Sequence, residues 1–492
     1  MKKMMVLMML SASIAVLTCC SAEDPLDDFG GNNSWNDFNN MPGNNGNAGT
    51  GELSTFDIAL DMTSAEPTNV ATAYFPDEED MLENNEFTTE VTIDMSNPVA
   101  KTENGVEVTV NEGHIKANHG DTKKVCYVVS GTTTNGSFTV VGEKKYAVRL
   151  NGVNITNPDS AALNLLSSKR AYIMLADGTT NTLADGEGGS HKGALYCKGK
   201  LLFNGSGKLS VTGNTNNGIH SADYIVFNKG NNVYVKSTVN NGIKANDGVF
   251  INGGILNVEV TAADVKGINC ESNIIINGGR TIVLASGYES EGIQADSTLT
   301  IAGGEVACHT YDDAINSKGD MIISGGYVYA HGQKNDGLDA NGNCYIKGGT
   351  VYAICSGTPE VAIDANTEGG YRLYVTGGTI VALGGLENGS QLSQTCYQTS
   401  SWTANSWYAL SDGSNSFSFH TPSSGGSGLV VSTASQPSLL SDVSVSGGTS
   451  YFSGIGIGNG TVSGGSEVSL SSYIGGNGMG GGPGGWGPGG WR

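Results

Sequence analysis

The sequence predicts an all-β protein whose central part is a right-handed parallel β-helix, a solenoid in which each turn of chain contributes short parallel strands. Three observations predict this fold. A glycine-containing element recurs every 22–25 residues from Gly218 onward. Apolar residues within each repeat alternate with the period of two that strands require. Finally, 74 of the 492 residues are glycine and only 15% are charged, a composition typical of turn-rich β proteins.

An element of the form apolar-x-Gly-Gly marks the same point of six repeats. Its copies are Ile251–Gly254, Ile276–Gly279, Ile301–Gly304, Ile323–Gly326, Ile346–Gly349 and Val375–Gly378. A second element lies between them, at Gly218-Ile219, Gly242-Ile243, Gly267-Ile268, Gly292-Ile293, Ala314-Ile315, Gly337-Leu338 and Ala362-Ile363. The glycine pair is expected at a corner of each turn, where a positive φ or close approach of neighbouring chains excludes a side chain.

Apolar residues at matching positions of successive repeats form columns that are expected to face inward. One column contains Val249, Ile274, Leu299, Met321, Cys344 and Leu373, and another contains Val258, Val283, Cys308, Ala330, Ala353 and Ala382. Cys308 and Cys344 are therefore expected to pack as small apolar side chains. The seven cysteines beyond Cys20 show no C-x-x-C spacing, which argues against a zinc site and against a complete set of disulfides.

The N-terminus has the pattern of an export signal, with Lys2-Lys3, an apolar stretch from Met4 to Leu17, and Cys19-Cys20. The stretch is shorter than the roughly 20 residues that span a bilayer. Residues 1–20 are therefore expected to be a lipoprotein signal peptide that leaves Cys20 as the lipidated N-terminus, and an ordinary secretion signal is the alternative. The acidic residues that follow resemble the export tag of surface-exposed lipoproteins in Bacteroidetes-type bacteria. The expected location is the outer membrane, exposed on the cell surface and held through a lipid anchor only.

The chain divides into segments of different composition. Residues 21–90 are expected to be a low-complexity, disordered linker with one short helix near 76–84. The solenoid is expected over 91–385, and its first strands are predicted at Val91–Asp94, Val106–Val110, Cys126–Val129, Ser137–Val141 and Tyr146–Ile155. Beyond Gly385 the repeat breaks. Residues 386–474 are expected to form a β-rich cap that shields the open edge of the last turn, and 475–492 a glycine-rich tail.

The charge balance limits the choice of partner. The chain has 25 Lys and Arg against 47 Asp and Glu, a formal net charge of −22. Nucleic acids and anionic membrane surfaces need clustered basic residues, and the sequence contains no run of more than two adjacent basic residues. Nucleic acid is therefore not expected as a partner, whereas protein partners stay unknown from the sequence.

Acidic residues concentrate at matching positions of three successive repeats, at Asp312-Asp313, at Asp336 and Asp339, and at Asp364. Equivalent positions on neighbouring turns lie about 4.8 Å apart. Two oxygen ligands on opposite sides of a Ca²⁺ ion, each at roughly 2.3–2.6 Å, have nearly the same separation. These five aspartates are therefore the predicted calcium ligands. The alternative is a solvated acidic edge whose repulsion is screened by salt.

Aromatic residues on outward positions offer a surface for sugars. Tyr327, Tyr329 and Tyr352 follow the glycine pairs, and flat aromatic faces suit the apolar faces of sugar rings. The alternative is that these tyrosines cover the solenoid against another segment. Catalysis has weaker support, because Lys318, Lys334 and Lys347 lie near the acidic patch but nothing in their spacing identifies a general base.

Several ordered motifs resemble bacterial carbohydrate-binding domain-containing proteins. They include YVVSGTTTNGSFTV from Tyr127, DDAINSKGDMIISGG from Asp312, NDGLDANGNCYIKGG from Asn335 and LVVSTASQPSL from Leu429. The resemblance implies a cell-surface β-helix similar to polysaccharide lyases, which binds calcium and acidic plant polysaccharide. The sequence departs from the family pattern at Asn316 and Asp339, where histidine is frequent, and at Val361, where an acid is expected.

The expected function is therefore calcium-assisted, non-catalytic binding of an extracellular polysaccharide, either pectin-like polygalacturonate or a cellulosic glycan. One alternative is a polysaccharide lyase on the same fold, and a second is a structural or adhesive surface protein. The fold does not decide between them, because β-helices carry all three functions.

Overall fold

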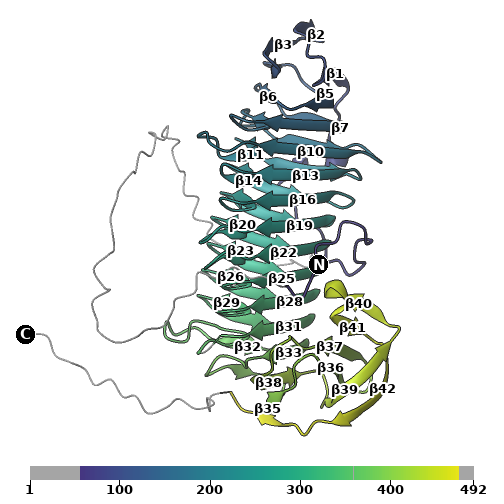
Figure 1. Cartoon of the computed structure of the whole chain (residues 1–492), viewed down its shortest axis with the longest axis vertical. Coiled ribbons are helices and arrows are strands. Elements are labelled where there is room, and N and C mark those ends of the chain that lie inside the picture. Colours follow the sequence, from purple (N-terminus) through teal and green to yellow (C-terminus); the bar gives the residue numbers. More distant parts are fainter. Residues whose placement is uncertain (1–55, 358, 476–492) are drawn as a thin grey trace, which may run out of the picture. The chain divides into compact units, whose positions relative to one another are not determined.

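The computed structural model describes residues 56–357 and 359–475, and within them the chain winds into a parallel β-solenoid (Figure 1). Each full turn contributes three strands, for example β17 (Ile243–Ala245), β18 (Gly248–Ile251) and β19 (Ile255–Val260). Each strand pairs in parallel with its equivalent one turn earlier and one turn later. The predicted all-β parallel β-helix is confirmed.

The stacked strands form three faces. Face 1 contains β6 (Ser137–Val141), β8 (Leu163–Leu165), β11 (Gly193–Cys197), β14 (Asn217–Ser221), β17, β20 (Lys266–Cys270), β23 (Glu291–Ala295), β26 (Ile315–Ser317) and β29 (Leu338–Ala340). Face 2 contains β9 (Ala171–Leu175), β12 (Leu201–Gly205), β15 (Tyr224–Phe227), β18, β21 (Asn273–Ile276), β24 (Leu299–Ile301), β27 (Met321–Ile323), β30 (Cys344–Ile346), β32 (Leu373–Val375) and β34 (Gln391–Leu392). Face 3 contains β10 (Thr180–Asp185), β13 (Lys208–Gly213), β16 (Asn232–Ser237), β19, β22 (Arg280–Ala285), β25 (Glu305–Thr310), β28 (Tyr327–Gly332), β31 (Thr350–Cys355) and β33 (Thr379–Leu383).

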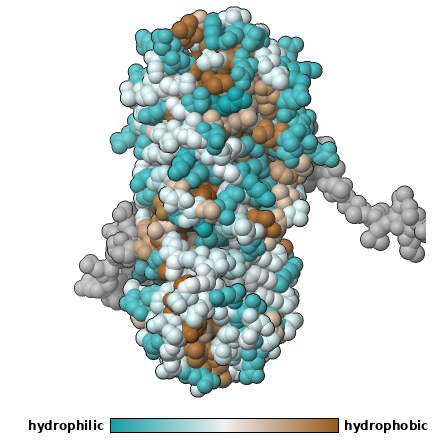
Figure 2. All heavy atoms as spheres, turned by 90° about the vertical axis from the view of Figure 1, so that its right-hand side faces the viewer, coloured by the Kyte–Doolittle hydropathy of each residue, from teal (hydrophilic) through white to brown (hydrophobic). Residues whose placement is uncertain are grey.

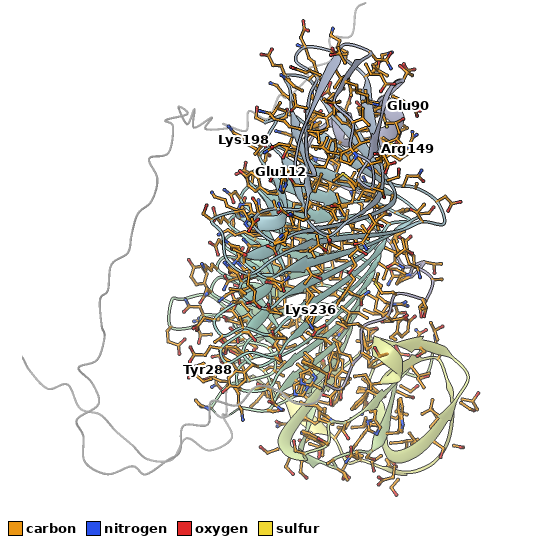
Figure 3. The ribbon with its side chains drawn as sticks, turned by 45° about the horizontal axis from the view of Figure 1, so that its top comes forward. Glu90, Glu112, Arg149, Lys198, Lys236 and Tyr288 are labelled. Atoms are coloured by element: carbon orange, nitrogen blue, oxygen red, sulfur yellow. The ribbon has the colours of Figure 1, made fainter. Side chains whose placement is uncertain are left out.

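The first turns are less regular than the later ones. β1 (Thr89–Asp94), β5 (Val125–Thr133) and β7 (Tyr146–Asn157) are parallel to one another, and β7 is long enough to pair with both β9 and β10. An ion pair of 2.7 Å between Glu90 and Arg149 links β1 to β7 (Figure 3). β2 (Lys101–Glu103), β3 (Val106–Asn111) and β4 (His114–Asn118) form antiparallel hairpins. The strand predicted at Val106–Val110 therefore exists, but it belongs to a terminal hairpin rather than to a parallel turn.

The predicted inward columns agree with the observed register. Val249, Ile274 and Leu299 lie directly above one another, and Met321, Cys344 and Leu373 continue the column. All six are fully buried. Burial of each such aliphatic side chain contributes roughly 1.5–3 kcal/mol, so the columns supply the core of the solenoid. All seven cysteines that the structure describes are buried and unpaired, and Cys308 and Cys344 belong to the main apolar core as predicted.

The second glycine of each apolar-x-Gly-Gly element turns the corner between faces 2 and 3. Gly279 and Gly304 have φ values of +76° and +80°, a region that side chains of L-residues disfavour. A Cβ atom added to Gly304 would also lie 2.6 Å from the carbonyl oxygen of Gly279 in the preceding turn. The stacked glycines are therefore required both by their own backbone conformation and by the close approach of neighbouring turns.

We predict that Gly304→Ala lowers the free energy of unfolding by about 2–4 kcal/mol, because it combines left-handed strain with a backbone clash. Gly178→Ala is the matched control, since Gly178 has a φ of +68° but nothing within 4 Å of an added Cβ. The control should cost only about 1–2 kcal/mol. Thermal melting followed by circular dichroism measures both, and equal losses would contradict the role assigned to the clash.

A segment that precedes the solenoid packs along its outside. This strap, residues 56–87, crosses from face 3 to face 2 and contains two 3₁₀ turns, η1 (Glu78–Asp80) and η2 (Leu82–Asn84), where one short helix was predicted. The expectation of a disordered linker over 21–90 is therefore wrong for this part. The reason is that the strap finds polar partners on the solenoid that its own sequence does not reveal. These contacts include Asp57 with His331, Asp61 with Asn257, Tyr74 with Asn252 and Asp80 with Arg170.

The start of the strap is held by a buried polar cluster. Asp57 Oδ2 accepts a hydrogen bond of 2.7 Å from His331 Nδ1 and one of 3.0 Å from the Tyr329 hydroxyl. The backbone N–H of Asp57 donates to His309 Nδ1 at 2.9 Å. Burial alone would raise the pKa of Asp57, but the bond from His331 and the positive charge of that ring outweigh it and lower the pKa to about 2. Burial lowers the pKa of His309 to about 3.

We predict that Asp57→Asn lowers stability at pH 6 by about 1–3 kcal/mol, because it replaces a charge-assisted hydrogen bond. The pKa of Asp57 is depressed on folding, so its stabilisation is present above about pH 4 and is lost as the pH falls towards 2. Acid unfolding curves should show that the variant loses this part of the pH dependence. Asp121→Asn, at an exposed position, is the control, and identical acid transitions of wild type and Asp57→Asn would contradict the prediction.

The C-terminal cap covers both the last turn and part of face 3. β35 (Cys396–Trp402), β38 (Gly426–Ser432) and β43 (Ser471–Tyr473) are antiparallel, and β38 pairs with β33, the last strand of face 3. This pairing covers the open edge of face 3. β34 is still parallel to β32, so the solenoid extends about one strand beyond the predicted boundary at residue 385.

A second sheet of the cap lies against the outside of face 3 (Figure 1). It contains β36 (Trp407–Ser411), β37 (Ser416–His420), β39 (Ser438–Ser446), β40 (Thr449–Tyr451), β41 (Gly456–Gly458) and β42 (Thr461–Glu467), with the 3₁₀ turn η3 (Phe452–Gly454) between β40 and β41. Its apolar residues pack with Tyr329 and Tyr352 of face 3 and with Ile58 of the strap. On the side shown in Figure 2, hydrophobic residues form short separate patches. No helix within the described residues is long and apolar enough to cross a membrane.

Candidate functional site

Six carboxylates gather on the outside of face 1 near its C-terminal end. We call Glu291, Asp313, Asp336, Asp339, Asp364 and Glu387 the acidic cluster. They form two columns, because the strand register places Glu291, Asp313 and Asp336 at equivalent positions on successive turns. The second column contains Asp339, Asp364 and Glu387, which are aligned through the bridges between Leu338, Ile363 and Leu386.

Three members of the cluster come close enough to share one ion. Asp336, Asp339 and Asp364 each offer a carboxylate oxygen, and these three oxygens lie within 4.8 Å of one another. Oxygen ligands on opposite sides of a Ca²⁺ ion are separated by about the same distance. The geometry therefore suits a cation that prefers oxygen and tolerates irregular coordination.

Backbone hydrogen bonds fix the direction of the carboxylates. Asp313 Oδ1 accepts a bond of 3.0 Å from the N–H of Asp336, and Asp336 Oδ1 accepts one of 2.8 Å from the N–H of Val361. Each aspartate is thus tied to the turn that follows it by one oxygen, which leaves its other oxygen for the cluster. Asn316 Nδ2 donates to Asp313 Oδ2 at 3.2 Å and to Asp339 Oδ2 at 2.6 Å, so this amide joins the two columns.

The environment disfavours negative charge on these groups. Asp313 and Asp336 are each only 5% exposed. Burial, together with the charges of Asp339, Glu360 and Glu387, raises the pKa of Asp336 to about 8. Burial and neighbouring carboxylates also raise the pKa of Asp313, Asp339 and Asp364. A bound cation would remove this penalty, since opposite charge favours the ionised form.

The donor set fits calcium in a further respect. The amide oxygen of Asn316 is buried and has no hydrogen-bond partner among the described residues, and amide oxygens are ordinary calcium ligands. Every candidate donor in the cluster is oxygen, which suits a hard cation better than a transition metal. A second group, formed by Asp57, His309 and His331, also has ligand atoms within 4.8 Å of one another, but its atoms are engaged in anchoring the strap.

The predicted metal ligands are brought together only in part. Asp336, Asp339 and Asp364 form the central triad, and Asp313 is joined to them through Asn316. Asp312 lies one residue before Asp313 and contributes no atom to the triad. The sequence analysis missed Glu291 and Glu387. Glu387 could have been found, because Leu386 continues the inward column of Leu338 and Ile363 beyond the point where the glycine repeat ends.

The prediction that Tyr329 and Tyr352 bind sugars is wrong, because both side chains are fully buried under the cap. The hydroxyl of Tyr329 bonds to Asp57, and the hydroxyl of Tyr352 donates to the carbonyl oxygen of His420 at 2.9 Å. Tyr327 is half-buried, and its ring stacks on Tyr451 with 3.6 Å between ring centroids. The alternative that these tyrosines cover the solenoid against another segment is the correct one.

Another aromatic side chain lies next to the acidic cluster. A cavity of about 420 Å³ between the last turns and the cap is lined by Glu360, Val361, Gln398, Trp402 and Tyr473, among others. Val361 is the residue whose N–H bonds to Asp336, so the cavity adjoins the cluster directly. Trp402 is half-buried there, with part of its ring available to a ligand.

The lysines considered as general bases are not members of the cluster. Lys318 forms an ion pair of 2.6 Å with Asp296, and Lys347 lies over the ring of Tyr345 at 5.0 Å. Lys334 lines a separate cavity beside His309 and His331. Among the described residues, Lys266 contacts the cluster, with its Nζ 3.2 Å from Glu291 Oε1.

The fold and the cluster define a parallel β-helix protein with a carboxylate-rich outer face. The chain belongs to the family of carbohydrate-binding domain-containing proteins, whose pattern it matches over residues 114–382, more than half of its length. This agrees with the resemblance seen in the sequence.

Two known proteins illustrate the similarity. A carbohydrate-binding domain-containing protein of Acetivibrio thermocellus is 34% identical over 126 residues, which cover 24% of this chain and 43% of that protein. The match thus spans less than half of the relative's length. A solved structure, described as the polysaccharide lyase-like protein from C. thermocellum in a gadolinium derivative, aligns with 56% of this chain and 95% of that chain, at 24% identity and a TM-score of 0.36.

Proposed function

We propose that this protein binds an extracellular polysaccharide through a calcium ion held in the acidic cluster, and that it does not cleave the polymer. The observation that carries the proposal is the triad of Asp336, Asp339 and Asp364, whose oxygens lie within 4.8 Å of one another. Membership of the carbohydrate-binding family supports the class of ligand.

The net charge of the chain bears on the kind of glycan. A protein with a charge of −22 repels a polyanion, so a uronate polymer that binds at the acidic cluster needs a cation between its carboxylates and those of the protein. Calcium, when bound, would supply that bridging positive charge. Asp336, Asp339 and Asp364 would hold it, with Asp313 and Glu387 adjacent in the two columns. Trp402, in the neighbouring cavity, would offer an aromatic face to a sugar ring.

The proposal also includes the cellular location of the protein, which is the outer membrane. Processing at Cys20 would leave a lipid-anchored protein on the outer membrane, with the solenoid exposed to glycans outside the cell. Cys20 and the rest of the signal segment, like the tail over 476–492, lie outside the described residues.

We predict that the double variant Asp339→Asn/Asp364→Asn loses at least tenfold in calcium-dependent affinity for polygalacturonate, because it removes two of the three charges that would face the ion. Affinity electrophoresis with and without calcium measures this. Asp121→Asn/Asp264→Asn changes the charge equally at two exposed positions outside the cluster and should behave as wild type. An unchanged calcium response in the cluster variant would overturn the assignment.

The same samples separate binding from cleavage. A polysaccharide lyase leaves an unsaturated sugar at the new chain end, which absorbs ultraviolet light. We expect retention on the polymer without rising absorbance. Absorbance that increases with time and is lost in the Lys266→Gln variant would favour the lyase, with Lys266 as its base.

A further inference from the structure

Seven basic residues stack on the corner between faces 1 and 2, far from the acidic cluster in the register of the solenoid. We call Lys123, Lys124, Lys144, Lys145, Lys169, Arg170 and Lys200 the basic ladder. The register aligns Val125, Tyr146, Ala171 and Leu201 on four successive turns. The residues directly before these four form the inner column of the ladder, which consists of Lys124, Lys145, Arg170 and Lys200. One residue earlier on the first three turns lies the outer column, which consists of Lys123, Lys144 and Lys169.

The two columns differ in their partners. Strap carboxylates neutralise most of the inner column: Glu86 pairs with Lys124 at 2.6 Å and Glu79 with Lys145 at 3.0 Å. Arg170 is paired with Asp80 at 2.8 Å. In the outer column, by contrast, Lys123, Lys144 and Lys169 form no ion pair within residues 56–357 and 359–475, although the chain as a whole is strongly acidic. Lys123 and Lys169 are exposed and Lys144 is half-buried, so three lysines without an ion pair lie on neighbouring turns.

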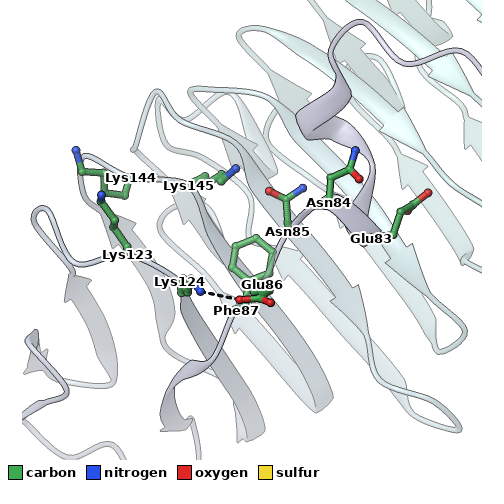
Figure 4. A pocket seen from close by; sticks show the side chains of 9 residues that line it. All are labelled: Glu83, Asn84, Asn85, Glu86, Phe87, Lys123, Lys124, Lys144 and Lys145. Atoms are coloured by element: carbon green, nitrogen blue, oxygen red, sulfur yellow. Dashed lines mark hydrogen bonds and ion pairs between the residues drawn. The ribbon is translucent and has the colours of Figure 1, made fainter.

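The ladder borders a hollow surface. A cavity of about 520 Å³ is lined by the first four lysines of the ladder, by Phe87, by the side-chain amides of Asn84 and Asn85, and by Glu83 and Glu86 (Figure 4). Glu86 is already paired with Lys124. A second cavity, of about 330 Å³, continues it along Lys144, Lys145, Lys169, Arg170 and Lys200, and its lining also includes Glu79 and Glu143. Because the two cavities share Lys144 and Lys145, they follow the solenoid axis over four turns.

The chemistry of this surface selects a linear anionic ligand. Like charges stacked about 4.8 Å apart repel one another, and a ligand with regularly repeated negative groups relieves that repulsion at every turn. The ring of Phe87 and the two amides suit the apolar face and the hydroxyls of a sugar. A nucleic acid would also bring repeated charges, and the overall charge of −22 opposes both kinds of polyanion equally. Membership of a carbohydrate-binding family favours the glycan.

We propose that the basic ladder is a second glycan-binding site, which holds the carboxylates of a uronate-containing polysaccharide directly on Lys123, Lys144 and Lys169, without calcium. This inference takes the class of partner from the proposed function, whereas the site itself depends on separate residues. The glycan would run along the solenoid axis at the N-terminal turns.

The test uses the full chain in EDTA, with polygalacturonate as the probe, so that calcium-dependent binding does not contribute. Lys123→Gln/Lys144→Gln/Lys169→Gln should weaken the remaining affinity at least tenfold. Lys192→Gln/Lys208→Gln/Lys229→Gln, an equal charge change at exposed lysines elsewhere, should change it less than twofold. The affinity of the wild type should also fall as salt is raised.

Three results would overturn the inference. One is the absence of calcium-independent affinity for polygalacturonate in the wild type, and another is a calcium-independent affinity that the ladder variant retains. The last is that the wild type binds a single-stranded oligonucleotide as tightly as polygalacturonate and that the ladder variant loses both affinities. That result would make the surface a general anion site. The calcium-dependent affinity of the ladder variant reports on the acidic cluster alone, so failure of one site is distinguishable from failure of the other.

Discussion

The structure depends on the parallel stacking of equivalent residues from turn to turn. Once neighbouring turns are hydrogen-bonded in register, every position of the repeat becomes a column with a spacing of about 4.8 Å. Inward positions then build a core of aligned Val, Ile, Leu and Cys side chains, and corner positions demand glycine. The same stacking brings like charges together wherever the repeat carries them on the outside. Both the acidic cluster and the basic ladder are consequences of this one constraint.

Stacking of like charges destabilises the folded protein, so its presence calls for a functional explanation. The carboxylates of Asp313 and Asp336 are almost fully buried, and their pKa values are raised by that burial. Without a cation, the folded protein therefore binds more protons than the unfolded chain, and its stability decreases as the pH rises from about 4 towards 8. A chain that needed only a folded solenoid would gain stability from asparagine there, as it has at the equivalent positions Asn217 and Asn241 on earlier turns. The cation site that we propose would account for the retained acids.

Sequence alone predicts the repetitive part of the molecule well, because the same residue pattern recurs in several repeats and supports each prediction several times. The inward columns, the glycine corners and the triad of Asp336, Asp339 and Asp364 were all accessible in this way. Features that occur only once could not be predicted from the sequence. The strap over 56–87 is polar and has no repeat, and its order comes from single contacts such as Asp57 with His331. The burial of Tyr329 and Tyr352 depends on how the cap folds back over face 3, and alternation along a strand does not report it. The basic ladder escaped notice because the first turns differ in length, so that Lys144, Lys169 and Lys200 do not share the later period.

Calcium titration by calorimetry tests the central claim most directly, if it is carried out at pH 7 in two buffers that differ in ionisation enthalpy. We predict that calcium binds the wild-type protein and displaces protons, because carboxylates such as Asp336, with a pKa of about 8, are protonated before the ion arrives. The number of protons released should fall as the pH is raised towards 9, and the Asp339→Asn/Asp364→Asn variant should lose the binding. Calcium binding without proton release, or no binding at all, would contradict the assignment of the acidic cluster.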